Sequence, residues 1–157
     1  MNYDASSADS FVLFELAGTT YGIRSAEVQQ LEMIEHITPV PNAAETVEGV
    51  VFSRGQVIPA ISLRARFGFE KIGYDVRSRL IVVSVDNRSI GLIVDSAREF
   101  KNIPPESISP PPEGLAALSG RYLEAIAAVG DSTILLLDLA EVVKPAAQEE
   151  DEEAAAA

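Results

Sequence analysis

The sequence predicts a mostly β fold built from two small barrels that share one core. Short runs rich in Val, Ile, Leu and Phe are separated by turn residues along the 157-residue chain, a pattern typical of barrels and sandwiches. About nine or ten such runs fall within roughly 135 residues, and a sheet with that many strands usually curls or splits. With 47% hydrophobic and 23% charged residues, the composition is that of a globular protein.

The N-terminal runs predict a hairpin. Residues 11–16 and 20–23 flank a turn that contains Gly18, and glycine readily adopts the positive φ that tight hairpin turns need. After this hairpin, Ser25 can cap a short helical turn, and residues 28–34 mix apolar with polar side chains. Helix and strand both remain open for this stretch, and a turn followed by a strand is favoured.

A second hairpin is expected in the next third of the chain. Residues 49–52 and 57–61 flank a four-residue connection that includes Gly55, a residue suited to turns. Pro59 has no N–H to donate to a neighbouring strand, so its strand is expected at a sheet edge or a bulge. Gly55 and Pro59 are therefore assigned structural roles.

A short helix is predicted at residues 63–67. Ser62 can cap its first turn, and Gly68 can end it. The polar and glycine-containing residues 68–78 that follow are expected to join the two lobes.

The third hairpin has the strongest pattern. Residues 80–85 and 89–94 are nearly continuous apolar runs on either side of Asp86-Asn87-Arg88, and Asp and Asn tolerate the left-handed conformation of such turns. Residues 100–103 are expected to add a strand. The prolines between residues 104 and 112 then predict an extended, irregular crossing.

The last elements are a hairpin and a helix. Residues 122–129 and 133–137 flank Gly130-Asp131-Ser132, which predicts the final hairpin. Asp138 can cap a terminal helix over residues 138–143, which Pro145 ends.

Charge is distributed unevenly along the chain. The 24 acidic and 12 basic residues give a formal net charge of −12, which disfavours nucleic-acid and anionic-membrane binding because those partners recruit an excess of Lys and Arg. Residues 64–121 carry nine bases and seven acids, whereas five acids form the run Glu149–Glu153. Arg24 and Arg54 are the only bases of the first 63 residues.

The residue types argue against catalysis and against a bound cofactor. The chain has no cysteine, so disulfides, thiolate metal sites and cysteine nucleophiles are excluded. The chain has a single histidine, His36, which disfavours a histidine-rich metal site and a Ser-His-Asp triad. Asp86 and Asp95 lie at the turn and the strand end of one hairpin, where aspartates more often cap than catalyse. No cofactor, metal or catalytic residue is therefore expected.

The two ends of the chain are expected to be disordered, at residues 1–10 and 146–157, which leaves one domain over residues 11–145. The first residues lack the basic and apolar regions of a signal peptide. The apolar runs are much shorter than the roughly 20 residues that span a bilayer, so a cytoplasmic protein is expected.

The order of these motifs resembles the CheW-like adaptors of bacterial chemosensory signalling. The resemblance covers residues 11–143, and its most specific part is the run from Arg54 to Arg64, which is similar to the family pattern Asn-Leu-Arg-Gly-x-x-Ile-Pro-Val-x-Asp-Leu-Arg. It is also carried by residues 11–16, 21–23, 28–31, 37–41, 47–50, 91–96 and 135–139. It implies two five-stranded SH3-like barrel lobes around a common core.

The resemblance also implies a function and a set of site residues. CheW-type proteins couple the cytoplasmic tips of chemoreceptors to a CheA-type histidine kinase without catalysis, and they join membrane receptor arrays through these partners. The implied receptor-binding residues are Val28, Leu31, Gly49, Arg54 and Gly91, and Asp95 is assigned a structural role. The first lobe is expected to dock the kinase through exposed strands, and the groove between the lobes to accept the receptor tip.

Four positions depart from the family pattern. Phe52 and Ser53 replace the Asn-Leu before the arginine, Ser62 replaces the later Asp, and Gln30 stands where an acid is expected. Two alternatives therefore stay open: a CheW-like scaffold of a different chemosensory pathway, such as surface motility or development, or an array protein that fills rings without receptor contact.

Overall fold

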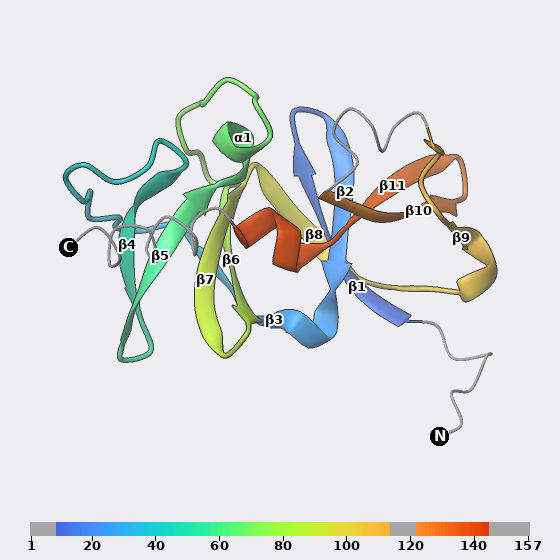
Figure 1. The fold of residues 1–157 in the computed structure, drawn as a ribbon, viewed down its shortest axis with the longest axis horizontal. Helices are drawn as coiled ribbons and strands as arrows, with labels where there is room; N and C mark the ends of the chain where they lie inside the picture. Colours follow the sequence, from blue (N-terminus) through green and yellow to red (C-terminus); the bar gives the residue numbers. More distant parts are fainter. Residues whose placement is uncertain (1–8, 114–121, 145–157) are drawn as a thin grey trace.

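The computed structural model describes residues 9–113 and 122–144, except for the side chain of Glu99. Its strands form two sheets that lie side by side in Figure 1. The six-stranded sheet has the order β8-β1-β2-β11-β10-β9. Its strands are β1 (Asp9–Leu16), β2 (Thr19–Arg24), β8 (Ser96–Ile103), β9 (Ile108–Ser109), β10 (Leu123–Val129) and β11 (Ser132–Leu137).

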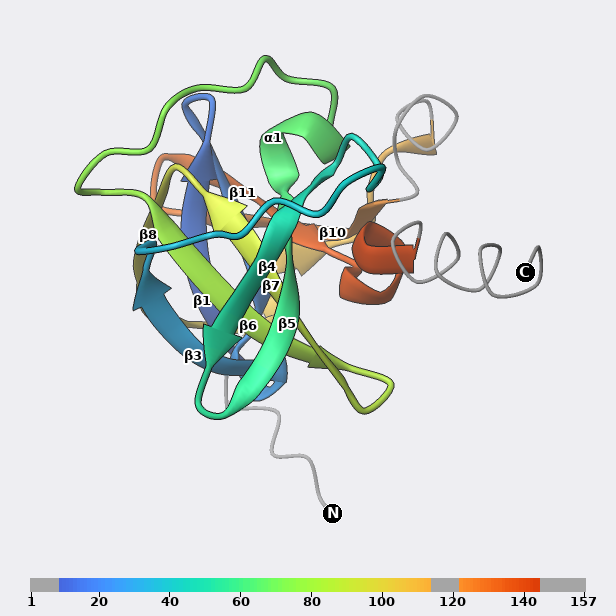
Figure 2. The same ribbon diagram turned by 90° about the vertical axis from the view of Figure 1, so that its left-hand side faces the viewer.

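The five-stranded sheet is formed by the middle of the chain, in the order β3-β6-β7-β5-β4. Its strands are β3 (Val28–Met33), β4 (Val47–Ser53), β5 (Gln56–Ser62), β6 (Arg79–Val85) and β7 (Arg88–Val94). In Figure 2 this sheet faces the viewer, with the β4–β5 hairpin projecting at its lower edge. We call the two parts the six-stranded lobe and the five-stranded lobe.

Short helices connect and cover the sheets. They are η1 (Ser25–Glu27), α1 (Leu63–Arg66), η2 (Pro105–Ser107) and a helical segment at residues 139–144. Ser62 caps α1 as expected, because its hydroxyl accepts a 3.2 Å hydrogen bond from the Ala65 N–H. The helical segment at 139–144 lies between the lobes in Figure 1. Among the described helices, none is long and apolar enough to cross a membrane.

All four predicted hairpins are confirmed, and three of them have two-residue turns with positive φ at both positions. These turns are Ala17-Gly18, Arg54-Gly55 and Asp86-Asn87, as a type I′ turn requires. The second hairpin was expected to have a four-residue connection. Its loop is shorter because strand pairing continues to Ser53 and Gln56.

Two expectations about the five-stranded lobe are wrong. Residues 68–78 do not join the lobes, because they run from α1 to β6 within one lobe; the chain crosses between lobes at η1 and at Asp95. Of the two alternatives for Pro59, the sheet edge is wrong, since β5 is between β7 and β4. The pairing of β4 with β5 does shift register beside it, between Val47 and Gly49. The internal strand tolerates the proline because its parallel pairing with β7 begins only at Ala60.

Hydrophobic side chains form one central cluster and one small cluster in each lobe. The central cluster takes Phe14 and Ile23 from the six-stranded lobe, Ile61 and Leu92 from the five-stranded lobe, and Val142 from the C-terminal helical segment. All five are buried. The shared core predicted from the sequence is therefore present, and it holds the two lobes together.

The expected disordered ends lie largely outside the described residues. Asp9 and Ser10 are an exception, because they begin β1 and pair with Ile103 and Asn102 of β8. Residues 146–157, with the acidic run, are not among the described residues.

Candidate functional site

Arg54 lies at the tip of the β4–β5 hairpin. Its side chain is exposed, and its backbone has a φ of 48°, a left-handed conformation that costs a residue with a Cβ roughly 1–2 kcal/mol. A cavity of about 240 Å³ adjoins it, lined also by Gln29, Gln30, Ser53 and Gln56. Ile58 and Val82 complete the lining, so the hairpin holds a cation beside a small cavity of mixed polar and apolar character.

A hydrogen-bonded chain of side chains borders this cavity. The Gln30 Nε2 donates to the Ser53 hydroxyl at 2.5 Å, and that hydroxyl donates to the Glu32 carboxylate at 2.6 Å. Gln30 and Glu32 belong to β3 and Ser53 to β4, which are the two edge strands of the five-stranded sheet. We call these three residues the β3–β4 seam. Their side-chain hydrogen bonds join the two edge strands and so bring the sheet closer to a closed barrel.

Sequence reasoning missed Glu32. The family pattern places an acid at position 30, where this chain has glutamine, and the structure shows a carboxylate two residues later on the same face of β3. The sequence could have indicated Glu32, because residues i and i+2 of a strand share a face and Glu32 is two residues after Gln30. Ser53, one of the departures from the family pattern, is the residue that binds both side chains.

Apolar side chains are exposed on the outer side of the seam. Leu31, Met33, Phe52 and Val57 are 36%, 59%, 75% and 65% exposed. Phe52 and Val57 are cross-strand partners, and Met33 and Phe52 line a second cavity of about 240 Å³. Apolar surface of this kind, beside a cation, is typical of interaction sites.

Gly49 and Gly91 lie in the interior of the same lobe. The register places Gln30, Val82, Gly91, Ala60 and Gly49 in one row across the five-stranded sheet. A Cβ at Gly49 would lie 2.2 Å from the Thr38 carbonyl oxygen, and a Cβ at Gly91 would lie 2.7 Å from a Leu80 methyl. Both glycines therefore permit close packing behind the site.

The other expected site residues lie in different surroundings. Val28 is half-buried against the central cluster, while Leu31 is exposed. Gly55 has a φ of 81° in the hairpin turn with no atom near its Cβ position, consistent with its assigned turn role. Asp95 binds Arg64 and the Ala17 N–H at the crossing between lobes. The five proposed receptor-binding residues thus do not line one groove.

A separate groove lies between the lobes. A cavity of about 220 Å³ is lined by Tyr21, Phe67, Tyr122, Leu135 and others. Tyr21 and Phe67 have ring centroids 5.7 Å apart, Phe67 and Tyr122 5.3 Å, and the Arg66 guanidinium lies 4.7 Å from the Tyr122 ring centroid. Burial raises the pKa of Tyr21. Sequence reasoning predicted a groove here but none of its aromatic residues.

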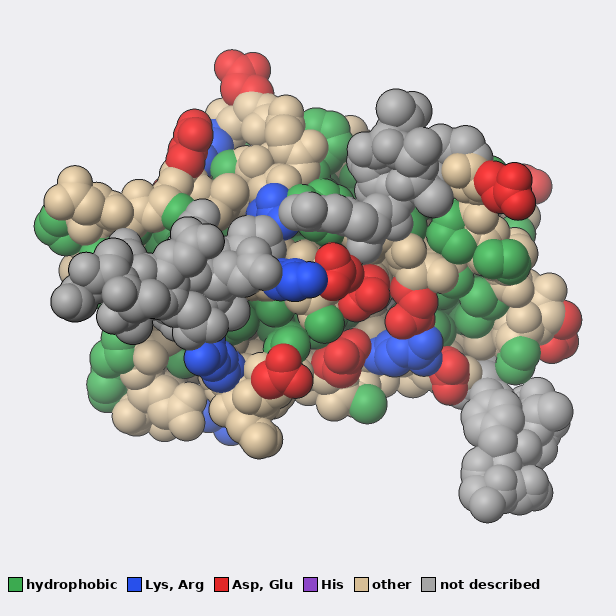
Figure 3. Space-filling view, viewed as in Figure 1, with side chains coloured by type: hydrophobic (Ala, Val, Ile, Leu, Met, Phe, Trp, Pro, Cys, Tyr) green, Lys and Arg blue, Asp and Glu red, His purple; other side chains and the backbone are tan. Residues whose placement is uncertain are grey.

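Charged side chains cover the boundary between the lobes. Acidic and basic groups are interspersed there on the face shown in Figure 3. One contribution comes from Arg24 of β2, which pairs with Asp9 and with Glu124. The described residues of this face therefore do not present the single-sign field that would attract a nucleic acid.

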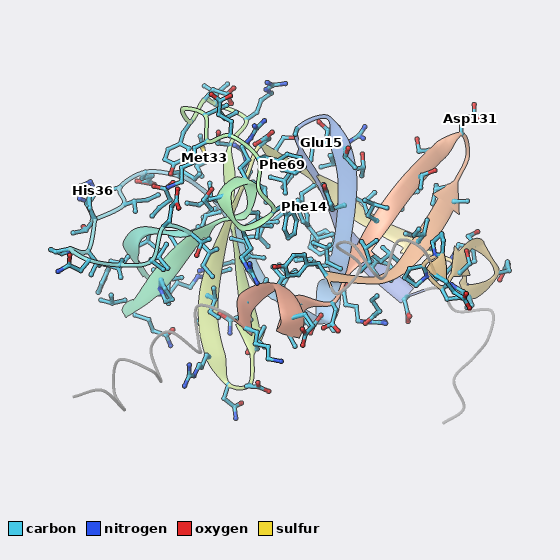
Figure 4. All side chains as sticks on the ribbon, turned by 45° about the horizontal axis from the view of Figure 1, so that its top comes forward. Phe14, Glu15, Met33, His36, Phe69 and Asp131 are labelled. Atoms are coloured by element: carbon cyan, nitrogen blue, oxygen red, sulfur yellow. The ribbon has the colours of Figure 1, made fainter. Side chains whose placement is uncertain are left out.

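Within the described ranges, no cluster of three or more His, Cys, Asp or Glu side chains could hold a metal ion. His36 and Asp131 lie at opposite ends of the molecule in Figure 4. Asp86 and Asp95 lie at opposite ends of β7. Neither of these two pairs of residues therefore comes together in one site.

Comparison with known proteins gives consistent matches. The model of the CheW-like domain family matches residues 10–146. The chemotaxis protein CheW of Klebsiella aerogenes is 30% identical over 129 residues, which are 82% of this chain and 78% of that protein. Protein FrzA of Myxococcus xanthus is 29% identical over 148 residues, covering 92% of this chain and 91% of FrzA.

A solved structure matches most of the chain. The crystal structure of the scaffolding protein TtCheW from Thermoanaerobacter tengcongensis superposes with a TM-score of 0.78 at 34% sequence identity. The match covers 83% of this chain and 89% of that one.

Proposed function

The chain belongs to the family of CheW-like domains, and from this membership we propose that it is a non-catalytic adaptor that couples chemoreceptors to a CheA-type histidine kinase. The observation that carries the proposal is the family match over residues 10–146, nearly the whole chain. The two-lobed architecture supports it. The protein would act in the cytoplasm, joined to receptor arrays through its partners.

The groove between the lobes supports receptor binding. Its lining is largely aromatic and aliphatic, with Tyr21, Phe67 and Leu135 contributed by both lobes. A helix that docks in an apolar groove supplies side chains at i, i+3 and i+4. The receptor would therefore provide the helical tip and this chain the groove.

The exposed strands of the six-stranded lobe support kinase docking. β8 is an edge strand of its sheet, and Phe100 on this strand is 59% exposed. An edge strand offers unpaired backbone groups together with its side chains. We assign the kinase contact to this lobe.

Co-sedimentation with receptor-containing membranes, with and without the kinase, tests the proposal. Phe69 also lines the groove, so Phe69→Asp places a charge there, and Phe100→Asp places a charge on β8. We expect the first variant to lose receptor binding and the second to lose kinase binding, while thermal melting of both stays close to wild type. Wild-type protein that binds neither partner would refute the adaptor function.

A second candidate is a CheW-like scaffold in a chemosensory pathway other than chemotaxis. The nearly full-length match to FrzA supports this second candidate, because FrzA, unlike the other relative named above, is not named as a chemotaxis protein. Affinity purification from the native cell separates the possibilities. Chemoreceptors of the swimming pathway in the eluate would support the main proposal, other receptors the second, and kinase without any receptor a ring-filling role.

A further inference from the structure

Residues 69–78 form a connection between α1 and β6, which we call the strap. It contains no helix or strand, and every residue from 69 to 77 is exposed. Figure 2 shows it crossing the top of the five-stranded lobe. Polar contacts hold it there: a terminal nitrogen of Arg64 donates to the Glu70 carbonyl at 3.0 Å, and the Lys71 ammonium donates to the Glu45 carbonyl at 3.0 Å. The strap is thus fixed to its lobe while its residues face solvent.

The strap carries four large apolar side chains that its own lobe does not cover. Ile72, Tyr74 and Val76 are 51%, 47% and 79% exposed, and Phe69 is exposed as well. None of the four belongs to a hydrophobic cluster that the described residues form. Ile72 and Tyr74 stand at alternate positions, which share one face in an extended chain. Apolar side chains gathered on an exposed segment mark an interaction surface.

The backbone of the strap is available for pairing with another chain. Among the described residues, no backbone–backbone hydrogen bond involves residues 70–74, and within that range only the Glu70 carbonyl accepts a bond, from Arg64. Unpaired N–H and C=O groups on an exposed segment are a template for a further strand. Strand addition combines backbone hydrogen bonds with side-chain contacts at alternate positions. The occupant of the strap is therefore expected to be another extended segment.

The strap is complementary to itself in the antiparallel direction. If two copies pair about Gly73, so that position 73 of one faces position 73 of the other, Ile72 lies opposite Tyr74 and Lys71 lies opposite Asp75. Both charged side chains are partly exposed. Opposite residues in an antiparallel pair have Cβ atoms about 5 Å apart, and aromatic–aliphatic pairs and opposite charges each stabilise the pairing. The two-fold symmetry supplies each of these pairs twice.

Gly73 suits the position on the two-fold axis. No atom lies within 4 Å of the point that a Cβ would occupy there, so a second backbone can approach without meeting a side chain of the first copy. In Figure 1 the strap projects beyond α1 at the edge of the molecule, which keeps the rest of the two copies apart. Interfaces in which both copies use the same patch are the commonest in homodimers.

We infer that the strap is a self-association site, at which two copies of this chain pair as antiparallel strands about Gly73. This dimer does not depend on the proposed adaptor function. Two paired strands are only marginally stable in water. Because the interface is also small, we expect a dissociation constant of about 0.1–1 mM.

Single-cysteine cross-linking of the full chain tests the dimer, since the chain has no cysteine of its own. Gly73→Cys places two thiols across the axis, where the Cα atoms of an antiparallel pair are about 4.5–5.5 Å apart and a disulfide can form. The matched control is Ser132→Cys, at the exposed start of β11 in the other lobe. With copper phenanthroline as oxidant, we expect Gly73→Cys to cross-link about tenfold faster than Ser132→Cys.

A mixture of two variants tests the register. Ile72→Cys and Tyr74→Cys are expected to cross-link mainly with each other, because these positions lie opposite one another across the axis, and mass spectrometry separates the three products. A statistical mixture of the products would overturn the pairing about Gly73. Equal cross-linking rates for Gly73→Cys and Ser132→Cys would overturn the dimer itself.

Sedimentation equilibrium of the cysteine-free chain provides an independent measurement. Between about 10 µM and 1 mM the average mass of wild type should rise toward that of a dimer. Ile72→Asp should abolish this rise, whereas Val40→Asp, which places the same charge on an exposed apolar residue of another loop, should leave it unchanged. A rise that persists in Ile72→Asp would overturn the inference.

A different occupant of the strap has its own signature. Wild type that stays monomeric up to about 1 mM, together with an Ile72→Asp variant that loses binding to the kinase or to a receptor fragment, would assign the strap to that partner. Such a result would overturn the inferred dimer and leave the adaptor function standing.

Discussion

Arg64 and Asp95 form a two-pronged ion pair that joins the two lobes. The Arg64 Nε lies 2.7 Å from one carboxylate oxygen and a terminal nitrogen lies 2.6 Å from the other. The same carboxylate accepts the Ala17 N–H at 2.9 Å. Arg64 belongs to α1 of the five-stranded lobe, and Ala17 to the β1–β2 turn of the other, so Asp95 connects the lobes where the chain crosses between them.

Breaking this pair is expected to destabilise the fold. The two side chains are 17% and 22% exposed, so Asp95→Asn removes a partly buried charge partner and lowers the free energy of unfolding by about 2 kcal/mol. Urea unfolding measures the change. Glu15→Gln, which breaks the exposed pair with Arg98, serves as the control and costs less than about 1 kcal/mol. Equal effects would contradict the assigned role of Asp95.

The Asp95 carboxyl also gives the stability a defined pH dependence. Burial alone would raise its pKa, but hydrogen bonds from Arg64 and the Ala17 N–H outweigh burial and hold the pKa below its ordinary value of 3.8. A depressed pKa stabilises the folded state above the ordinary value, and the stabilisation is lost as pH falls through 3.8 toward the folded-state pKa.

Unfolding measured from pH 6 to pH 2.5 checks this dependence. Wild type and Asp95→Asn should differ by a constant amount at pH 5 and above, and the difference should shrink below pH 4. A difference that stays constant down to pH 2.5 would show that the carboxylate charge contributes nothing.

Arg54→Asn is expected to make the protein more stable. Asparagine adopts the left-handed conformation at lower cost than arginine, so the free energy of unfolding should rise by about 1 kcal/mol. Thermal and urea unfolding measure it, with Arg54→Val as the contrasting variant, since a β-branched residue is strained at positive φ. A variant that gains stability while losing receptor affinity would separate folding from binding at one position.

Gly49→Ala and Gly91→Ala should differ in cost. At Gly49 a Cβ meets the Thr38 backbone carbonyl, which cannot move without breaking its bond to the Val50 N–H, so we expect a loss of about 2–3 kcal/mol. At Gly91 it meets the flexible end of Leu80, and the expected loss is about 1 kcal/mol. Urea unfolding ranks them, and the reverse order would refute this packing explanation.

Local chemistry explains why most elements were predictable. The hairpin turn at Asp86-Asn87 and the cap at Ser62 depend on residues that are adjacent in sequence, and both were confirmed. Pro59 shows the limit of local rules. Its effect depends on where the parallel pairing with β7 begins, which is a long-range property that the sequence does not reveal.

The site was predictable only in part, for the same reason. Arg54 could be singled out because its motif is continuous, and its receptor role stays a prediction. The seam partner Glu32 and the aromatic residues Tyr21, Phe67 and Tyr122 meet only through tertiary structure. The lobe boundary was wrongly predicted at residues 68–78. A polar, glycine-containing sequence is equally typical of a linker between two lobes and of a surface loop within one lobe.

The order of strands has a consequence for synthesis on the ribosome. β2 pairs with β11 in parallel, through Tyr21 with Leu135 and Gly22 with Leu136. By contrast, all five strands of the five-stranded sheet are contained in residues 28–94. The five-stranded sheet can therefore assemble while the C-terminal strands are still untranslated. β1 can pair with β8 as soon as residue 103 has emerged, but β2 has no partner on its other edge until β11 emerges. Until then Phe11 also lacks Ile134 and Leu136 of its hydrophobic cluster. During synthesis, the nascent chain thus has the greatest need for chaperone protection at its N-terminus, which is the part made first.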